Sequence, residues 1–149
     1  MADIDVVKKI REATGLSLGE ISKSLREAAG DEAKTLEILK ARGVAIAEKK
    51  SSREIKEGVV EAYIHSTKKV GVLLELGSET DFVARHADFQ NLAHDLAMQV
   101  ASMRPQTVEE LLSQPFIKDS SMTVADLLSR HIAKLGENIR VGNFVRFEI

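Results

Sequence analysis

The sequence predicts an α+β protein, in which a small helical bundle precedes a three-stranded antiparallel sheet packed with helices. Over residues 1–43, apolar residues repeat at helical spacing and a glycine follows each run, whereas residues 57–149 mix helical runs with alternating segments. The charge changes as well, because residues 1–56 hold 12 Lys and Arg against 10 Asp and Glu, while the rest holds 9 against 13. We therefore expect a module at 1–43, a helical linker at 44–56 and an α+β core at 57–149.

The first module is expected to contain three short helices. Gly15, Gly30 and Gly43 follow the apolar runs, at the place where a left-handed residue commonly ends a helix. Ser17 and Asp31 precede the second and third runs and are residue types that accept hydrogen bonds from the first helical N–H groups. A bundle of about 45 residues is near the lower limit for folding without staples.

The core is expected to begin with an antiparallel hairpin. Val60, Ala62 and Ile64 alternate with polar or bulkier residues, as in a half-buried strand. Residues 66–69 then form a polar turn, and the apolar run 70–76 predicts the second strand.

Helices and one further strand are expected in the remainder. Apolar spacing predicts helices over 89–103 and 123–135, with a short helix between Thr107 and Pro115. Residues of one parity then predict a final strand with an apolar face: Ile139, Val141, Val145, Phe147 and Ile149.

Composition excludes several classes of protein. The chain has no cysteine, which removes disulfides, thiol catalysis and cysteine-ligated metals. A net charge of −2 and a pI of about 6.1 give no reason to expect direct nucleic-acid binding. No apolar stretch approaches the ~18 residues of a membrane span, and the first residues lack the order of a secretory signal. We expect a cytoplasmic protein with no membrane partner.

No enzyme chemistry is indicated. The sequence has no phosphate-binding glycine loop, dinucleotide fingerprint or serine nucleophile elbow. The four histidines, His65, His86, His94 and His131, match no short metal-ligand spacing and are expected to be solvated or structural. We expect no catalytic residues, metal or cofactor.

The segment 78–85 is unusual because it places Phe82 and Val83 in an otherwise polar loop after the second strand. An acidic residue beside an aromatic one, as in Asp81 and Phe82, suits a wedge that contacts another protein. In the simpler interpretation, Thr80 or Asp81 caps a helix and Phe82 fills the gap between helix and sheet.

Two further joints are candidate contact sites. Leu135 and Gly136 predict a helix end, where a glycine can also let another backbone approach. In the joint between the first two helices, Leu16 or Leu18 is either exposed or packs against the helix start.

These features, in this order, resemble the elongation factor Ts family, the guanine-nucleotide exchange factors of elongation factor Tu. Residues 7–15 look like its N-terminal signature, within a ubiquitin-associated-like three-helix module. Residues 80–85, Thr-Asp-Phe-Val-Ala-Arg, are similar to its most specific motif, and residues 134–139 resemble a turn near the end of its first core subdomain.

The resemblance implies a protein that changes no covalent bond. Asp81 and Phe82, flanked by Thr80 and Val83, would wedge beside the magnesium site of elongation factor Tu. Displacing Mg²⁺ removes the cation that neutralises the phosphates, so that GDP dissociates faster.

The same resemblance assigns further contacts with elongation factor Tu. Leu135 and Gly136 would disturb its phosphate-binding loop, and Leu16, Leu18 and Gly19 would bind it from the N-terminal module. The family usually has two large apolar residues where this chain has Leu18 and Gly19, so the grip of this module would differ.

The chain resembles a short member of the family with one core subdomain. An uncovered sheet then leaves an apolar face or an unpaired edge exposed. We expect a homodimer in which a second copy covers the sheet, through residues that include Ile139, Val141, Val145 and Phe147.

Two alternatives remain. One is a binding scaffold that uses the ubiquitin-associated-like module and has no exchange activity. The other is a DNA-binding helix-turn-helix over residues 18–25, which the charge of +2 over residues 1–56 does not favour.

Overall fold

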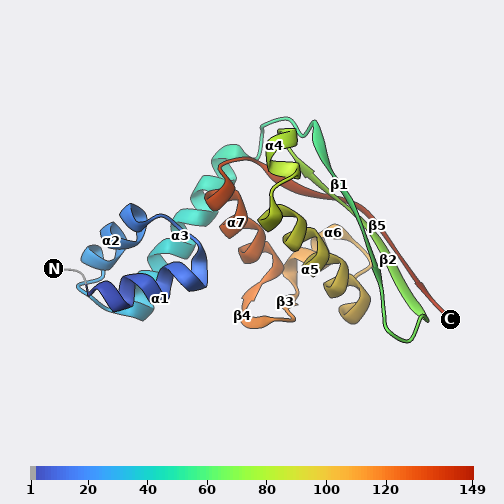
Figure 1. Cartoon of the computed structure of the whole chain (residues 1–149), viewed down its shortest axis with the longest axis horizontal. Helices are drawn as coiled ribbons and strands as arrows, with labels where there is room; N and C mark the ends of the chain where they lie inside the picture. Colours follow the sequence, from blue (N-terminus) through green and yellow to red (C-terminus); the bar gives the residue numbers. More distant parts are fainter. Residues whose placement is uncertain (1–2) are drawn as a thin grey trace.

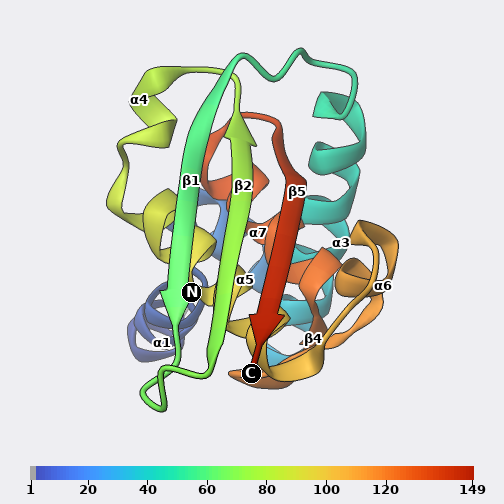
Figure 2. The same cartoon turned by 90° about the vertical axis from the view of Figure 1, so that its right-hand side faces the viewer.

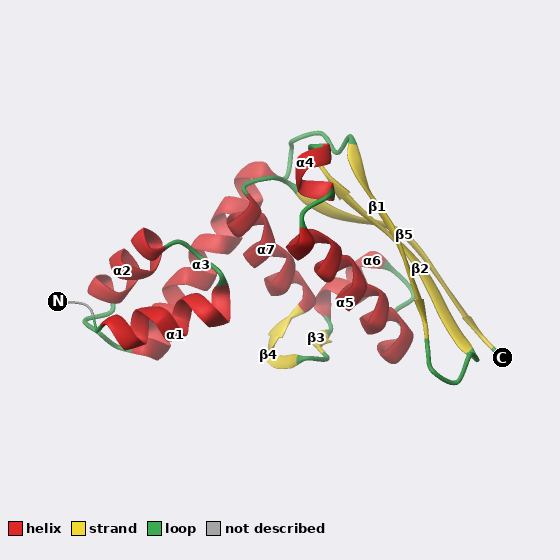
Figure 3. Cartoon of the chain, viewed as in Figure 1, coloured by secondary structure: helices red, strands yellow, loops and turns green. Residues whose placement is uncertain are grey.

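A computed structural model describes residues 3–149 and confirms the α+β class. The helices are Ile4–Thr14 (α1), Leu18–Glu27 (α2), Glu32–Lys50 (α3), Asp81–Ala84 (α4), Ala87–Met103 (α5), Val108–Ser113 (α6) and Val124–Leu135 (α7). The strands are Glu57–Ile64 (β1), Val70–Ser78 (β2), Pro115–Phe116 (β3), Asp119–Thr123 (β4) and Ile139–Glu148 (β5). The helical module lies at one end and the three-stranded sheet at the other, with α3 leading from one to the other (Figures 1 and 3).

The expected helix starts hold, and the first helix ends at Gly15 as expected, whereas α2 ends at Glu27, three residues before Gly30. Gly15 adopts the left-handed conformation, with φ of 68°, and its N–H donates to Arg11 O. The Asp31 side chain accepts from the backbone N–H of Lys34 and so caps α3. A small buried cluster holds the module together: Val7, Ile10, Leu16, Ile21, Leu25 and Leu39.

The expected helix end at Gly43 is wrong, because α3 continues to Lys50. Gly43 faces α7, where a Cβ placed on it would lie 3.7 Å from Ser129 O. Ile46 and Ala47 pack against the core that the sheet and α5 form, and this burial outweighs the low helix propensity of one glycine. The expected linker at 44–56 therefore divides into the last turns of α3 and the connection to β1.

The expected three-stranded antiparallel sheet is confirmed, with the order β1-β2-β5. Figure 2 shows its strands in front and the helices behind one face. Large side chains of α5 and β2 fill the space between the layers and are almost inaccessible: Val72, Leu74, Leu76, Phe89, Leu92, Leu96 and Val100.

The alternation over β1 is confirmed, but the three apolar residues on which it was based face away from the helices. The register pairs Tyr63 with Val72 and Glu61 with Leu74, and directly opposite residues share a face of the sheet. Since Val72 and Leu74 are buried beneath the helices, Tyr63 and Glu61 face the helices too, where Tyr63 makes an edge contact with His94. The β1 residues on the outer face are Val60, Ala62 and Ile64.

The expectation that the apolar residues of β5 share one face is wrong. Val141 pairs with Leu76 and Val145 pairs with Leu73, so β5 has one more residue than β2 over this stretch and forms a bulge. The extra residue switches the parity. Ile139 and Val141 are therefore buried in the core, whereas Val145, Phe147 and Ile149 are exposed on the outer face.

The outer face of the sheet consequently carries exposed apolar side chains, as expected. We call the following residues the outer-face patch: Val60, Ile64, Leu73, Val145, Phe147 and Ile149. Phe147 is 67% exposed in this patch. No helix of the described chain, residues 3–149, covers it in Figure 2.

A small hairpin of β3 and β4, between α6 and α7, was not anticipated from the sequence. Its strands are short and mostly polar, so no apolar alternation marks them. Phe116 and Met122 nevertheless bury their side chains in the core and so fix the start of α7.

The continuity of α3 predicts that alanine substitutions at Gly43 and Gly15 change the free energy of unfolding in opposite directions. Gly43→Ala should raise the free energy of unfolding by about 0.5–1 kcal/mol, because alanine favours a helix interior and its Cβ meets only ordinary contacts. Gly15→Ala should lower it, since φ is positive there and a Cβ would lie 2.6 Å from Lys134 Nζ. Urea unfolding followed by circular dichroism measures both, and a loss of stability in Gly43→Ala would contradict a continuous helix.

Candidate functional site

The segment after β2 forms a single helical turn, α4, that presents one exposed aromatic ring. Thr80 is its N-cap, and the Thr80 hydroxyl accepts from the N–H of Val83 at 3.4 Å. Phe82 is 89% exposed, whereas Val83 is 9% exposed and packs in the core. The interpretation of Phe82 as a plug between helix and sheet is therefore wrong, because Val83 takes that place and Phe82 points to the surface.

An ion pair and backbone hydrogen bonds hold the short segment that carries this ring. The half-exposed carboxylate of Asp81 pairs with the guanidinium of Arg85 one turn later. The N–H of Arg85 donates to Asp81 O at 3.0 Å, and the N–H of His86 donates to Val83 O at 2.9 Å. His86 then caps α5 by accepting from the N–H of Asp88. An acidic group and an exposed phenyl ring thus stand side by side on a defined backbone.

The second candidate segment is the turn that ends α7. Gly136 is its left-handed C-cap, with φ of 78°, and its N–H donates to Ile132 O at 2.9 Å. A Cβ placed on Gly136 would meet no heavy atom within 4 Å, so the backbone is open to the surface. Leu135 is half-buried and packs against the core.

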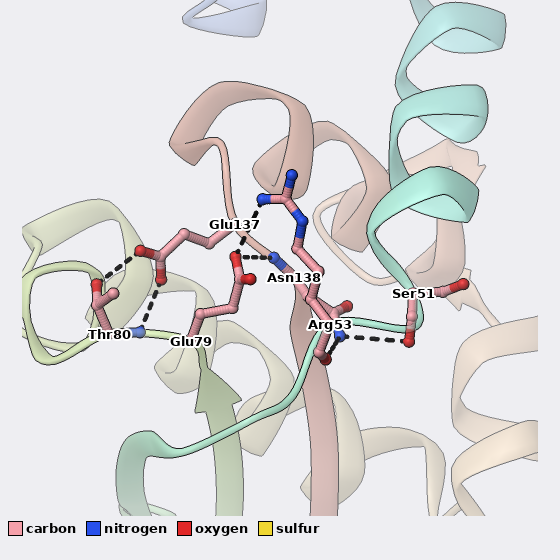
Figure 4. A network of polar contacts seen from close by, with 6 residues as sticks. All are labelled: Ser51, Arg53, Glu79, Thr80, Glu137 and Asn138. Carbon is pink, nitrogen blue, oxygen red and sulfur yellow. Dashed lines mark hydrogen bonds and ion pairs between the residues drawn. The ribbon is translucent and has the colours of Figure 1, made fainter.

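Side chains connect these two segments directly (Figure 4). The Glu137 carboxylate accepts from the Thr80 N–H at 3.0 Å and from the Thr80 hydroxyl at 2.6 Å. The Glu79 carboxylate accepts from the N–H of Asn138 at 3.0 Å. Residues 79–83 and 135–138, nearly 60 positions apart in the sequence, thus form one surface.

The same network reaches the connection between α3 and β1. The Asn138 side-chain amide donates to Arg53 O at 2.8 Å, and Arg53 Nη1 lies 3.7 Å from the Glu79 carboxylate. Asn138 is 3% exposed, so these bonds satisfy a buried amide. Three parts of the chain therefore meet at the end of the sheet where β2 stops and β5 starts.

The joint between α1 and α2 lies against α7, where Gly15 contacts Lys134. Leu16 is 8% exposed and lies in the buried cluster of the module, so it is not available at the surface. Leu18 is 49% exposed and begins α2, and a Cβ placed on Gly19 would meet no heavy atom within 4 Å. Of the three residues expected to contact a partner from this module, Leu18 and Gly19 are accessible.

Lys134 brings the N-terminal joint close to the α7 turn. Its stem and ammonium group lie against Gly15, and Lys134 Nζ pairs with the Asp88 carboxylate at 2.5 Å. The hydrogen bond from Lys134 lowers the pKa of Asp88. The three candidate segments are thus arranged around the C-terminal turn of α7.

His131, on the same helix, has a structural environment. Burial lowers its pKa, and because a carbonyl can only accept, its Nδ1–H donates to Leu127 O at 3.0 Å. Within residues 3–149, no group of three or more His, Asp or Glu side chains is placed to hold a metal ion. The site presents an exposed ring at Phe82 and an open backbone at Gly136.

The sequence did not single out the residues that join the segments, namely Arg53, Glu79, Lys134, Glu137 and Asn138. Each of the dipeptides Glu79-Thr80 and Glu137-Asn138 begins with the glutamate that accepts an N–H from the other dipeptide. Only the pairing of β2 with β5 places the two dipeptides opposite each other.

A known protein family matches the part of the chain that contains the candidate site. The family model described as Elongation factor TS matches residues 79–149, which include both α4 and the α7 turn. In the described part of the chain, no helix is both long enough and apolar enough to cross a membrane.

Curated relatives match along the whole chain. The chain is 38% identical to Elongation factor Ts of Carboxydothermus hydrogenoformans over 194 positions, which cover 100% of this chain and 89% of that protein. It is 39% identical to Elongation factor Ts of Thermotoga petrophila, covering 98% and 95%, and 38% identical to that of Thermodesulfovibrio yellowstonii, covering 97% and 94%. Since 194 aligned positions exceed the 149 residues here, the first relative has residues that this chain lacks. The length of these matches shows that the chain belongs to the elongation factor Ts family.

Proposed function

We propose that this chain promotes the release of GDP from elongation factor Tu, with Asp81 and Phe82 of α4 as the wedge. The observation that carries the proposal is the exposure of Phe82, 89%, on a helical turn that is hydrogen-bonded at both its N-cap and its C-cap. A large ring held in water has no stabilising role in its own fold, whereas aromatic residues are frequent energetic centres of protein interfaces.

The proposed action is non-covalent. The carboxylate of Asp81 and the ring of Phe82 would enter beside the Mg²⁺ that neutralises the GDP phosphates, and Leu135 with Gly136 would press on the phosphate-binding loop. Thr80 and Val83 would hold the wedge, because one caps α4 and the other anchors it in the core. Binding of this chain to the distorted partner then lowers the affinity of that partner for GDP. By linkage, GDP weakens the binding of this chain by the same factor.

The N-terminal module would supply a second contact with elongation factor Tu. Leu18 and Gly19 lie exposed at the start of α2, while buried Leu16 would act only by fixing the shape of that joint. A partner that binds both the module and the α4 surface would meet them on a common support, α7. This action requires neither a cofactor nor a nucleic acid, and the protein would act in the cytoplasm.

A binding scaffold without exchange activity is the second candidate. The exposed Leu18 of the ubiquitin-associated-like module favours it, because that surface could bind a partner alone. The two candidates differ in whether bound GDP leaves faster.

We further propose a twofold homodimer through the outer-face patch. Residues Ile139 and Val141 belong to the core, so the interface would use Val145 and Phe147 together with the exposed side chains of β1. Removing apolar area from water favours association, and a twofold axis places the same patch on both copies.

The exchange activity has a direct test. Wild-type chain should accelerate the release of a fluorescent GDP analogue from elongation factor Tu at fixed Mg²⁺. Phe82→Ala should lower the maximal acceleration about tenfold or more, since removal of a central aromatic anchor typically costs 2 kcal/mol or more. Stopped-flow fluorescence measures both rates.

Measuring the free energy of unfolding of each variant shows whether a loss of activity comes from a loss of structure. Because Phe82 is exposed, Phe82→Ala should change the free energy of unfolding by less than about 0.5 kcal/mol. Phe89→Ala, at a fully buried phenylalanine, should cost about 3–5 kcal/mol. Wild-type chain that binds without accelerating GDP release would support the scaffold instead.

The dimer is tested by sedimentation. Wild-type chain should sediment at about twice the 16.4 kDa of one chain at micromolar concentration. Phe147→Glu should raise the dimer dissociation constant at least about tenfold by placing a charge in the apolar interface. Asn91→Glu adds the same charge on the exposed side of α5 and should leave the dimer unchanged. A wild-type monomer would contradict the proposed interface.

A further inference from the structure

The bonds between residues 79–80 and 137–138 continue the pairing of β2 with β5 by other means. The last paired residues are Ser78 and Ile139, so the next positions in register are Glu79 opposite Asn138 and Thr80 opposite Glu137. At both positions a side-chain carboxylate accepts the N–H of the residue opposite. We call this pair of contacts the carboxylate clasp.

We infer that Glu137 is a positioning residue, which holds α4 and the Gly136 turn in one fixed arrangement before any partner binds. This inference rests on the proposed exchange function for its consequence, whereas the positioning itself concerns the free chain. Both hydrogen bonds of the Glu137 carboxylate are made with Thr80, so Glu137 acts through that residue.

The geometry of Thr80 explains why one carboxylate has this effect. The Thr80 hydroxyl donates its proton to Glu137 Oε2 at 2.6 Å, which leaves a lone pair oriented toward the N–H of Val83. The Thr80 N–H donates to the other carboxylate oxygen at 3.0 Å. Such paired, charge-assisted bonds fix both the orientation of Thr80 and its distance from Glu137. Without them, the N–H of the half-buried Thr80 loses its acceptor.

α4 depends on such outside support because it has four residues. A single helical turn forms at an entropic cost that its few internal hydrogen bonds do not repay. Val83 and Ala84 anchor the buried side of the turn, but the N-terminal end that carries Asp81 and Phe82 is held through Thr80.

Glu137 is also tied to the second contact segment. It follows Gly136, whose left-handed conformation and bond to Ile132 O fix the direction of the chain leaving α7. The clasp therefore fixes the separation of Phe82 from Gly136. A partner that contacts both then pays less ordering entropy, which appears as tighter binding.

This role predicts a different kinetic signature from that of Phe82. When a binding-competent conformation is only partly populated, the apparent dissociation constant rises by the inverse of that population. Glu137→Ala should therefore raise the half-saturating concentration for GDP release about tenfold and leave the maximal rate within about twofold. Phe82→Ala lowers the maximal rate.

The experiment compares wild type, Glu137→Ala, Glu137→Gln and the control Glu109→Ala. Glutamine retains an acceptor for the Thr80 N–H and should restore at least part of the affinity, while Glu109 is an exposed glutamate of α6 away from the clasp. The first readout is the release of a fluorescent GDP analogue from elongation factor Tu against chain concentration. The second is amide hydrogen exchange in the free chain, where Glu137→Ala should speed exchange at Thr80 and Val83 about tenfold while β2 stays protected.

Two results would overturn the inference: unchanged exchange at Thr80 and Val83 in Glu137→Ala, or a lowered maximal rate with unchanged half-saturation. If Glu137→Ala fails to fold, Glu137→Asp, which shortens the side chain and withdraws the carboxylate from Thr80, is judged by the same two readouts. A wild-type chain that does not accelerate GDP release would refute the exchange function, and the hydrogen-exchange comparison would still decide whether Glu137 positions α4.

Discussion

The pairing of β2 with β5 is the constraint on which the rest of the structure depends. These strands are about 60 residues apart in the sequence, and their register brings the segment after β2 against the segment before β5. Beyond the last backbone pair, Glu79 and Glu137 continue the register with their carboxylates. A surface made from two distant segments is therefore as well defined as the sheet itself.

The same pair of strands separates two surfaces of the molecule. The bulge in β5 sends Ile139 and Val141 into the core but Val145 and Phe147 to the outer face. α4 and the Gly136 turn lie at the end of the sheet where β2 stops and β5 starts. The outer-face patch lies on the side of the sheet that Figure 2 shows uncovered. Contact with a second copy and contact with elongation factor Tu, as proposed, would thus use different faces.

Helix α7 links the N-terminal module to this surface. Its residues Ser129 and Ala133 lie against Gly43 of α3, Lys134 lies against Gly15 in the α1–α2 joint, and its last residues form the turn beside α4. The continuity of α3 through Gly43 adds to this support, because the helix belongs to both parts. The positions of Leu18 and Phe82 are consequently set on one framework.

The sequence by itself determined the α+β class, the helix caps at Gly15, Asp31 and Gly136, and the three segments that contain the candidate site. These depend on local patterns, in which spacing and residue type act within a few positions of the chain. Only the tertiary structure decided which side of each strand is covered, where α3 ends, and that Phe82 rather than Val83 is exposed. Periodicity states which residues share a face, whereas register, a bulge and the packing of distant helices decide what that face meets.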